Sequence, residues 1–185
     1  MIVILDDFSH ENTHGEMITK IVKTHSLVPI RKIHIPNIID SDKLYGLLNN
    51  LKYITDKNDV VLITWAKEPD EQLDFIVSNL GIKTNVIVSA GNFNQNIINF
   101  SPTRTSNITV VGCLNKSLLK ASHSNYSDND MKWIVGTSYV MEEQVQNGTS
   151  VSAAIYSAFL ANCIEKNDPS FLEQQINQYH NSVKI

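Results

Sequence analysis

Short runs of apolar residues recur along the first two-thirds of the chain, and polar or turn residues separate them. Five of these runs are rich in valine and isoleucine: Ile2–Leu5, Val28–Ile35, Val60–Ile63, Val86–Val88 and Ile108–Val111. Continuous apolar runs of this length are typical of strands that are buried on both faces, as in a parallel sheet. The pattern therefore predicts five fully buried strands.

Segments with helical spacing lie between these runs. Residues 42–53 carry one stripe of leucines, residues 70–80 carry a similar apolar stripe, and residues 15–24 form a shorter helical segment. Alternation of short strands with amphipathic helices is typical of βαβ units. We therefore expect an α/β fold: a three-layer, doubly wound, mostly parallel sheet with helices on both faces.

The second half of the chain is less regular. Residues 92–106 are rich in Asn, Ser and Thr and predict a long loop, and residues 114–147 predict two or three short strands. A mostly apolar helix is predicted over 149–162, and Asp168-Pro169-Ser170 begins a last helix because proline favours the first helical position. The predicted inner face of that last helix consists of Phe171, Ile176 and Tyr179. Since no linker or repeat divides the sequence, we expect a single domain over residues 1–185.

Composition and charge exclude several classes of protein. The 185 residues carry a net charge of −4 without a run of Lys or Arg, so a nucleic-acid partner is not expected. No apolar stretch reaches the roughly 18 residues of a membrane span, and the first residues lack the basic region of a signal peptide. We therefore expect a cytoplasmic protein without membrane contact. Cys113 and Cys163 lack metal or redox spacing, which favours buried thiols over a disulfide.

One short motif points to a metal. His10-Glu11-Asn12-Thr13-His14 matches the H-E-x-x-H pattern. On a helix the two histidines would share one face and bind zinc, and the glutamate would act as general base. However, Gly15 follows at once, and the pattern falls in the turn after the first strand. A zinc hydrolase therefore stays an alternative rather than the leading hypothesis.

A second set of polar residues is spread over the whole chain. Asp6 ends the first strand, His14 opens the next helix, Asn92 follows a later strand and Ser150 opens the long apolar helix. In parallel α/β sheets, functional groups gather beyond the carboxyl ends of the strands. Together these four residues would supply an acid, a base, a side-chain amide and a nucleophile.

The chemistry suggests a role for each of the four. Ser150 would attack a carbonyl after His14 takes its proton, and Asp6 would hold the imidazole in the correct tautomer. Asn92 would donate a hydrogen bond to the oxyanion beside the backbone N–H of Ser150. Asp7 is the alternative orienting acid, but Asp6 is favoured because it directly follows the apolar run.

Several segments carry a family resemblance. Residues 13–15 (Thr-His-Gly) resemble the His-Gly-Thr motif of subtilases, and residues 89–92 (Ser-Ala-Gly-Asn) resemble Ala-Ala-Gly-Asn. Residues 148–153 resemble Gly-Thr-Ser-Met-Ala-x, and residues 107–112 resemble the strand after the oxyanion loop. The order Asp…His…Ser is also that of the family. The chain thus resembles an unusually short subtilisin-like serine protease (subtilase, peptidase family S8), which implies a serine endopeptidase acting on a peptide or protein substrate.

The resemblance also indicates where a peptide would bind. Residues Thr64, Trp65 and Ala66 align with the family's Ser-Leu-Gly segment, which pairs with the substrate backbone. Ser89, Ala90 and Gly91 are the second expected binding segment. A tryptophan at position 65 would fill or reshape the specificity pocket. The resemblance implies no organic cofactor, and structural calcium stays open, although calcium-loop patterns are not recognisable.

The departures from the family pattern leave a different class of function open. Only eight positions separate Asp6 from His14, where the family has a longer segment. If this short segment or Trp65 leaves the site misassembled, the chain would be a non-catalytic peptide-binding module. A second chain or copy could also complete the pocket. Hydrogen-bond reach from His14 to both Asp6 and Ser150 is the geometric criterion that favours the enzyme.

Overall fold

A computed structural model describes residues 1–11, 13–36, 40–128, 130–141 and 144–184. Six strands form one sheet in the order β2-β1-β3-β4-β5-β6, and every neighbouring pair is parallel. Their bounds are β1 Ile2–Asp6, β2 Ile30–His34, β3 Val60–Ile63, β4 Asn85–Ser89, β5 Thr109–Leu114 and β6 Lys132–Val135. A small antiparallel hairpin consists of β7 (Tyr139–Met141) and β8 (Gln144–Gln146).

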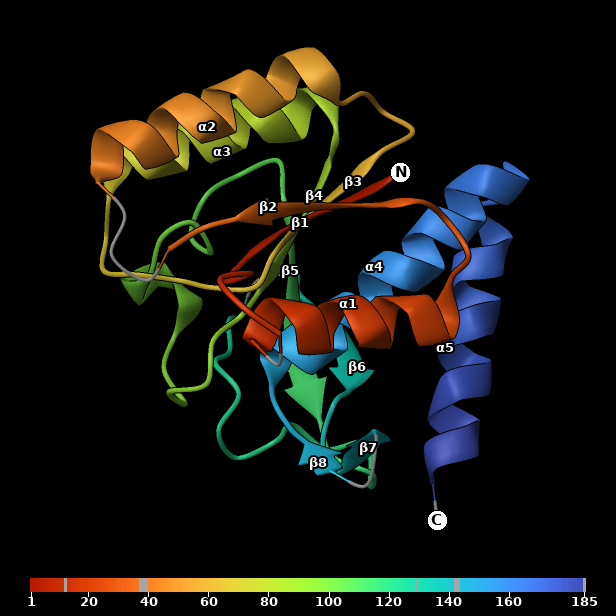
Figure 1. Ribbon diagram of the computed structural model, residues 1–185. Coiled ribbons are helices and arrows are strands. Elements are labelled where there is room, and N and C mark those ends of the chain that lie inside the picture. Colours follow the sequence, from red (N-terminus) through yellow and green to blue (C-terminus); the bar gives the residue numbers. More distant parts are fainter. Residues whose placement is uncertain (12, 37–39, 129, 142–143, 185) are drawn as a thin grey trace.

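The helices cover both faces of this sheet (Figure 1). Their bounds are α1 His14–His25, α2 Ser41–Ile54, α3 Glu71–Lys83, α4 Thr149–Lys166 and α5 Ser170–Val183, with a 3-10 turn η1 at Ile97–Asn99. Helices α2 and α3 lie together on one face, α1 and α4 lie on the other, and α5 packs along α4. The predicted three-layer, doubly wound α/β fold is therefore confirmed.

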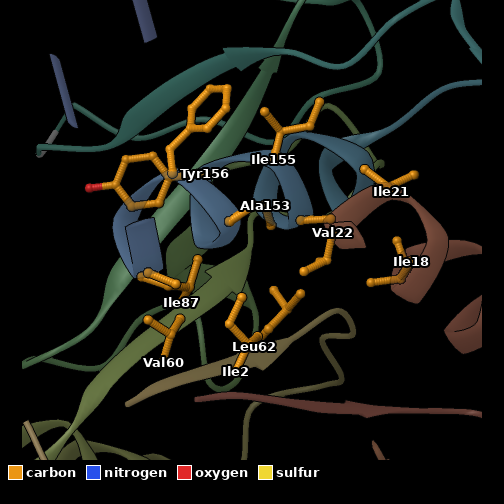
Figure 2. Close-up of a cluster of buried hydrophobic side chains, with 14 of the residues drawn as sticks. Ile2, Ile18, Ile21, Val22, Val60, Leu62, Ile87, Ala153, Ile155 and Tyr156 are labelled. Atoms are coloured by element: carbon orange, nitrogen blue, oxygen red, sulfur yellow. The ribbon is translucent and has the colours of Figure 1, made fainter. Parts of the chain in front are cut away.

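Strand β1 joins the two hydrophobic cores. All five of its residues are buried. Because side chains alternate along a strand, Ile2 and Ile4 pack with α1 and α4, whereas Val3 and Leu5 pack with α2 and α3. Figure 2 shows the first of these cores, where Ile2 and its neighbours on β3 and β4 face side chains from α1 and α4. Burial on both faces explains why the first four residues of the strand are all apolar.

The prediction of a fully buried strand at Val28–Ile35 is wrong for its central residues. β2 is an edge strand of the sheet, and none of its five residues is fully buried. Arg31 and Lys32 are exposed there, whereas Val28 and Ile35 on either side of the strand are buried. An edge strand has a neighbour on only one side, so charged side chains are tolerated there and also discourage pairing with other chains.

The last helix differs from its prediction in one residue. Leu172, Ile176 and Tyr179 pack against the core around α4. Their spacing of four and three residues places them on one stripe of a helix, whereas Phe171 is five residues from Ile176. Phe171 instead lies beneath Lys166, whose Nζ is 3.6 Å from the ring centroid. The prediction of Phe171 as an inner-face residue is therefore wrong.

Two further predictions concern the cysteines and the membrane. Cys113 and Cys163 are both buried and both free, as predicted. Within the described part of the chain, every helix is too short or too polar to cross a bilayer.

We predict that Leu62→Ala strongly destabilises the fold. Leu62 lies on β3 and is fully buried, so the substitution removes apolar contacts and leaves a cavity, at a typical cost of about 2–5 kcal/mol. Leu27→Ala is the matched control because Leu27 is 97% exposed, and its effect should stay within about 0.5 kcal/mol. Urea unfolding measures both free energies of unfolding. Similar values for the two variants would contradict the assignment of β3 to the core.

We also predict that the fold loses stability as the pH falls below about 6.5. His25 stands among the rings of Tyr139, Phe159 and Tyr179, with centroids 5.5 to 5.9 Å away, and this burial lowers its pKa from 6.5. The unfolded chain therefore takes up the proton more readily. The stability that neutral, buried His25 contributes is fully present above the pKa of this residue in the unfolded chain. It is lost as the pH falls from that value towards the lower pKa of His25 in the folded protein.

The measurement compares the free energy of unfolding at pH 7.5 and pH 5.0. In His25→Gln the difference between the two pH values should shrink, because the group that titrates in the aromatic cluster is gone. His10→Gln is the matched control, since His10 is exposed. A pH dependence that is the same in wild type and His25→Gln would refute this assignment.

Candidate active site

The predicted site residues meet at the carboxyl edge of the sheet. Asp6 is the last residue of β1, Thr64 directly follows β3, and Ser89 ends β4. His14 is the first residue of α1 and Ser150 is the second residue of α4. Because all strands of the sheet are parallel, their carboxyl ends lie at the same edge, which is where the chain places its polar side chains.

The imidazole of His14 lies between Asp6 and Ser150. Its Nδ1 is 2.7 Å from Asp6 Oδ2, and its Nε2 is 3.1 Å from Ser150 Oγ. A carboxylate can only accept a hydrogen bond, so the contact to Asp6 favours the tautomer with the proton on Nδ1. Nε2 is then the acceptor that faces the Ser150 hydroxyl. The side chain of His14 is 43% exposed, so part of the ring is open to solvent although both nitrogens have partners.

The carboxylate of Asp6 is buried and fully engaged. Its Oδ1 accepts a hydrogen bond from the backbone N–H of Asp7 at 2.7 Å. Its Oδ2 accepts from His14 and from the hydroxyl of Thr64. A buried carboxylate needs such donors to stay charged. Asp7, the alternative acid, accepts instead from the backbone N–H of Ser9 at 2.9 Å.

One backbone hydrogen bond closes the short connection between Asp6 and His14, and a second bond ties the connection to β2. The N–H of Gly15 donates to the carbonyl of Asp7 at 3.1 Å, which joins the start of α1 to the residue that follows β1. The N–H of Phe8 donates to His34 Nδ1 on β2 at 2.9 Å. Eight positions are therefore enough to bring His14 onto Asp6, although the sequence left this open.

The start of α4 is tied to the loop that carries Asn92. The backbone N–H of Thr149 donates to Asn92 Oδ1, and the hydroxyl of Thr149 accepts from the N–H of Gly91, both at 3.0 Å. With its oxygen occupied in this way, the Asn92 amide has its two N–H donors for another acceptor. The sequence motif at residues 148–153 includes Thr149, but it did not reveal the role of this residue, because both bonds reach a segment distant in the sequence.

A pocket of about 690 Å³ opens beside His14. It is lined by Asp6, Asp7, His14, Ile35, Pro36, Ser41, Leu44, Thr64, Trp65, Ala66 and Lys67. Of the two expected binding segments, residues 64–66 contribute to this lining. Trp65 and Ala66 are half-buried, and Thr64 is buried with its hydroxyl turned to Asp6. In the other segment Ser89 and Ala90 are buried and Gly91 is half-buried.

Lys67, which lines the pocket at its rim, belongs to an ion pair that the sequence did not reveal. Asp70 caps α3, and its Oδ2 accepts from Lys67 Nζ at 2.9 Å and from the Tyr45 hydroxyl at 2.7 Å. Burial acts to raise the pKa of Asp70, but the hydrogen bonds from Lys67, the Leu73 N–H and Tyr45 outweigh it and lower the pKa to about 2. The rim therefore carries a fixed charged cluster at neutral pH.

The zinc motif lacks the helix that it requires. Helix α1 begins only at His14, whereas His10 lies before it, is exposed, and contacts Ser9 Oγ through Nδ1 at 2.9 Å. Asn12 in the middle of the motif lies outside the described residues. Among the residues that are described, no group of three His, Cys, Asp or Glu side chains is placed to hold a metal ion. The two histidines do not form the helical face on which the zinc hypothesis rests.

Comparison of the sequence with known proteins finds a relative. The protein named "Putative subtilisin-like proteinase 2" of Encephalitozoon cuniculi (strain GB-M1) is 24% identical over 162 residues. The match covers 83% of this chain and 30% of that protein, so the chain spans less than a third of the relative's length. No family model matches the chain.

Comparison of the structures gives a consistent result. A cold adapted subtilisin-like serine proteinase superposes with a TM-score of 0.74 at 14% identity, over 95% of this chain and 79% of that one. The prenylagaramide maturation protease PagA superposes with a TM-score of 0.69 at 15% identity, over 94% and 79% of the two chains. The chain therefore has the subtilisin-like fold, and the resemblance found in its sequence motifs is confirmed.

We predict opposite effects for alanine at two glycines. Gly148 precedes α4 at a φ of 134°, which side chains rarely adopt, and a Cβ there would lie 3.2 Å from Asn92 Nδ2. Gly148→Ala should cost about 1–3 kcal/mol of the free energy of unfolding. Gly46 lies within α2 with open space around it. Gly46→Ala should therefore stabilise the fold by about 0.5–1 kcal/mol. Thermal unfolding of both variants checks the signs, and a neutral Gly148→Ala would contradict the described turn.

Proposed function

We propose that this chain is a serine endopeptidase that cleaves peptide bonds through Asp6, His14 and Ser150. The observation that carries the proposal is the position of the His14 ring, which has one nitrogen 2.7 Å from a buried carboxylate and the other 3.1 Å from a serine hydroxyl. A serine is activated when its hydroxyl is hydrogen-bonded to a base and an acid orients that base through a second hydrogen bond. The fold shared with subtilisin-like proteases agrees with it.

The first half of the proposed reaction forms an acyl-enzyme. Ser150 Oγ attacks the scissile carbonyl carbon while its proton passes to His14 Nε2, and the carbonyl electrons move onto the oxygen. Asp6 stabilises the imidazolium that results. The tetrahedral intermediate then expels the amine, which takes from His14 the proton that came from Ser150. In the second half, water attacks the ester in the same way and releases the acid and Ser150.

The negative charge on the tetrahedral oxygen requires donors. We assign this role to the side-chain amide of Asn92 together with the backbone N–H of Ser150. The Asn92 oxygen is committed to the Thr149 N–H, which leaves the amide nitrogen as the donor near the start of α4. The N-terminus of a helix also favours developing negative charge. Removal of one such donor typically lowers kcat by about 10²–10³-fold.

The substrate is proposed to lie as an extended peptide along residues 64–66, with residues 89–91 on its other side. Backbone pairing of this kind is strand addition, in which main-chain hydrogen bonds give affinity and pockets select side chains. The pocket beside His14 has an apolar wall formed by Ile35, Leu44 and Trp65. It would thus accept an apolar side chain of the peptide. The proposed steps use only side chains, backbone amides and water, so no cofactor is assigned.

The non-catalytic peptide-binding module is less well supported. That hypothesis depends on a short Asp6–His14 segment, or a Trp65 side chain, that leaves the site misassembled. The backbone hydrogen bond from Gly15 to Asp7 closes the segment without separating Asp6 from His14. Trp65 packs against the core of α2 and α3 and lines the pocket wall. Both observations favour the enzyme.

We predict that a fluorophosphonate probe labels the wild-type protein at Ser150 and fails to label Ser150→Ala. The reason is that the probe reacts with a serine hydroxyl only when a base activates it. Ser170→Ala is the matched control, since Ser170 also stands at a helix start but its hydroxyl bonds to Asp168. Labelling is read by intact-protein mass. Equal labelling of wild type and Ser150→Ala would exclude this mechanism.

A cleavage profile against a cellular proteome extends the same test to the substrate. New peptide termini should appear with the wild type and with Ser170→Ala, and should be missing with Ser150→Ala. The wild type could also bind peptides without being labelled and without cleaving any of them. In that case the binding module is the correct function.

A further inference from the structure

Asn125 is a fully buried amide in the irregular segment between β5 and β6. Its Oδ1 accepts hydrogen bonds from the backbone N–H groups of Phe93 and Gln95, both at 3.0 Å. Its Nδ2 donates to the carbonyl of Ala90 at 2.9 Å, and its backbone N–H donates to the carbonyl of Gly91 at 2.9 Å. These four bonds all reach residues 90–95, on both sides of Asn92.

The loop is shaped to admit this side chain. Gly91 has a φ of 96°, and a Cβ built there would lie 2.6 Å from Asn125 Nδ2. Only glycine combines that backbone conformation with so close an approach. Gly91 and Asn125 are therefore complementary, because the glycine provides the space that the amide fills.

Asn92 is thus held from two directions. Asn125 fixes the backbone before and after it, and Thr149 at the start of α4 binds its side-chain oxygen. The Asn92 side chain itself is exposed to solvent. An exposed side chain keeps one orientation only if its backbone and one of its polar atoms are fixed by buried partners.

We propose that Asn125 is a positioning residue that aims the Asn92 amide at the oxyanion site. The inference rests on the proposed function and extends it to a residue remote from the reacting atoms. Asn125 would contact neither substrate nor intermediate and would act only through the 90–95 loop. The sequence offered no signal for it, because one asparagine in a polar, irregular segment looks like any surface residue.

The chemistry of the amide explains why asparagine is required. The site presents two N–H donors and one carbonyl acceptor, so a side chain must accept twice and donate once. Aspartate keeps both acceptor contacts, but its second oxygen would face the carbonyl of Ala90 in place of the donor, and alanine loses all three contacts. Both Asn125→Asp and Asn125→Ala should therefore loosen the loop.

The test measures kcat and KM for p-nitrophenyl acetate hydrolysis, at a temperature at which circular dichroism shows every variant to be folded. Asn125→Ala should lower kcat by about 10- to 100-fold with little change in KM, because a misplaced donor costs transition-state stabilisation. Asn125→Asp should lower kcat as well, because the carbonyl of Ala90 would then lack its donor. Asn162→Ala is the matched control: Asn162 also bonds through both side-chain atoms, but to Ser26 and His25. Its kcat should not change.

A double-mutant cycle separates positioning from general damage. If Asn125 acts through Asn92, then Asn125→Ala should lower kcat no further in the Asn92→Ala background. Independent losses that multiply would overturn the proposal, as would an unchanged kcat in Asn125→Ala.

A separate readout applies if the wild type hydrolyses no ester or peptide, in which case the proposed function fails first. The Asn92 side-chain amide is then followed by NMR in the wild type, Asn125→Ala and Asn162→Ala. A shifted and more rapidly exchanging Asn92 amide in Asn125→Ala alone supports positioning. An identical Asn92 signal in all three proteins overturns it.

Discussion

Burial of β1 on both faces is the constraint on which the rest of the structure depends. Its first four residues alternate between the core of α1 and α4 and the core of α2 and α3. A strand buried on both faces has room for a polar side chain only at its carboxyl end, and this last residue is Asp6. The carboxylate is consequently delivered to the edge where α1 and α4 begin. Asp6 is thus both the end of the buried strand and the partner of His14.

The polar edge follows the rule that buried polar groups need partners. Asp6 obtains three donors, from Asp7, His14 and Thr64. Asn125 satisfies two amides and one carbonyl of the 90–95 loop in the same manner. Each network also orients an exposed group, His14 in one case and Asn92 in the other. Stability and pre-organisation therefore come from the same hydrogen bonds.

The differences between the sequence-based expectations and the structure share a physical cause. An apolar run predicts burial, but Val28–Ile35 includes an edge strand whose Arg31 and Lys32 face solvent. The apolar pattern of a strand does not determine how many neighbouring strands it has in the sheet. Phe171 is apolar but lies beside the inner stripe of α5. The H-E-x-x-H spacing carries a zinc site only on a helix, and α1 begins four residues too late. In each case a local pattern depended on a tertiary placement.

The sequence by itself determined the α/β class, the order of the elements and the residue types at the carboxyl ends of the strands, because periodicity and motif order are local properties of the chain. Only the tertiary structure decided which side chains meet. Asp6 and Ser150 are 144 positions apart, and their contacts with His14 depend on the register of the parallel strands and the packing of α1 on α4. Thr149 and Asn125 became visible in the same way, since a hydrogen bond between distant segments leaves no local pattern in the sequence.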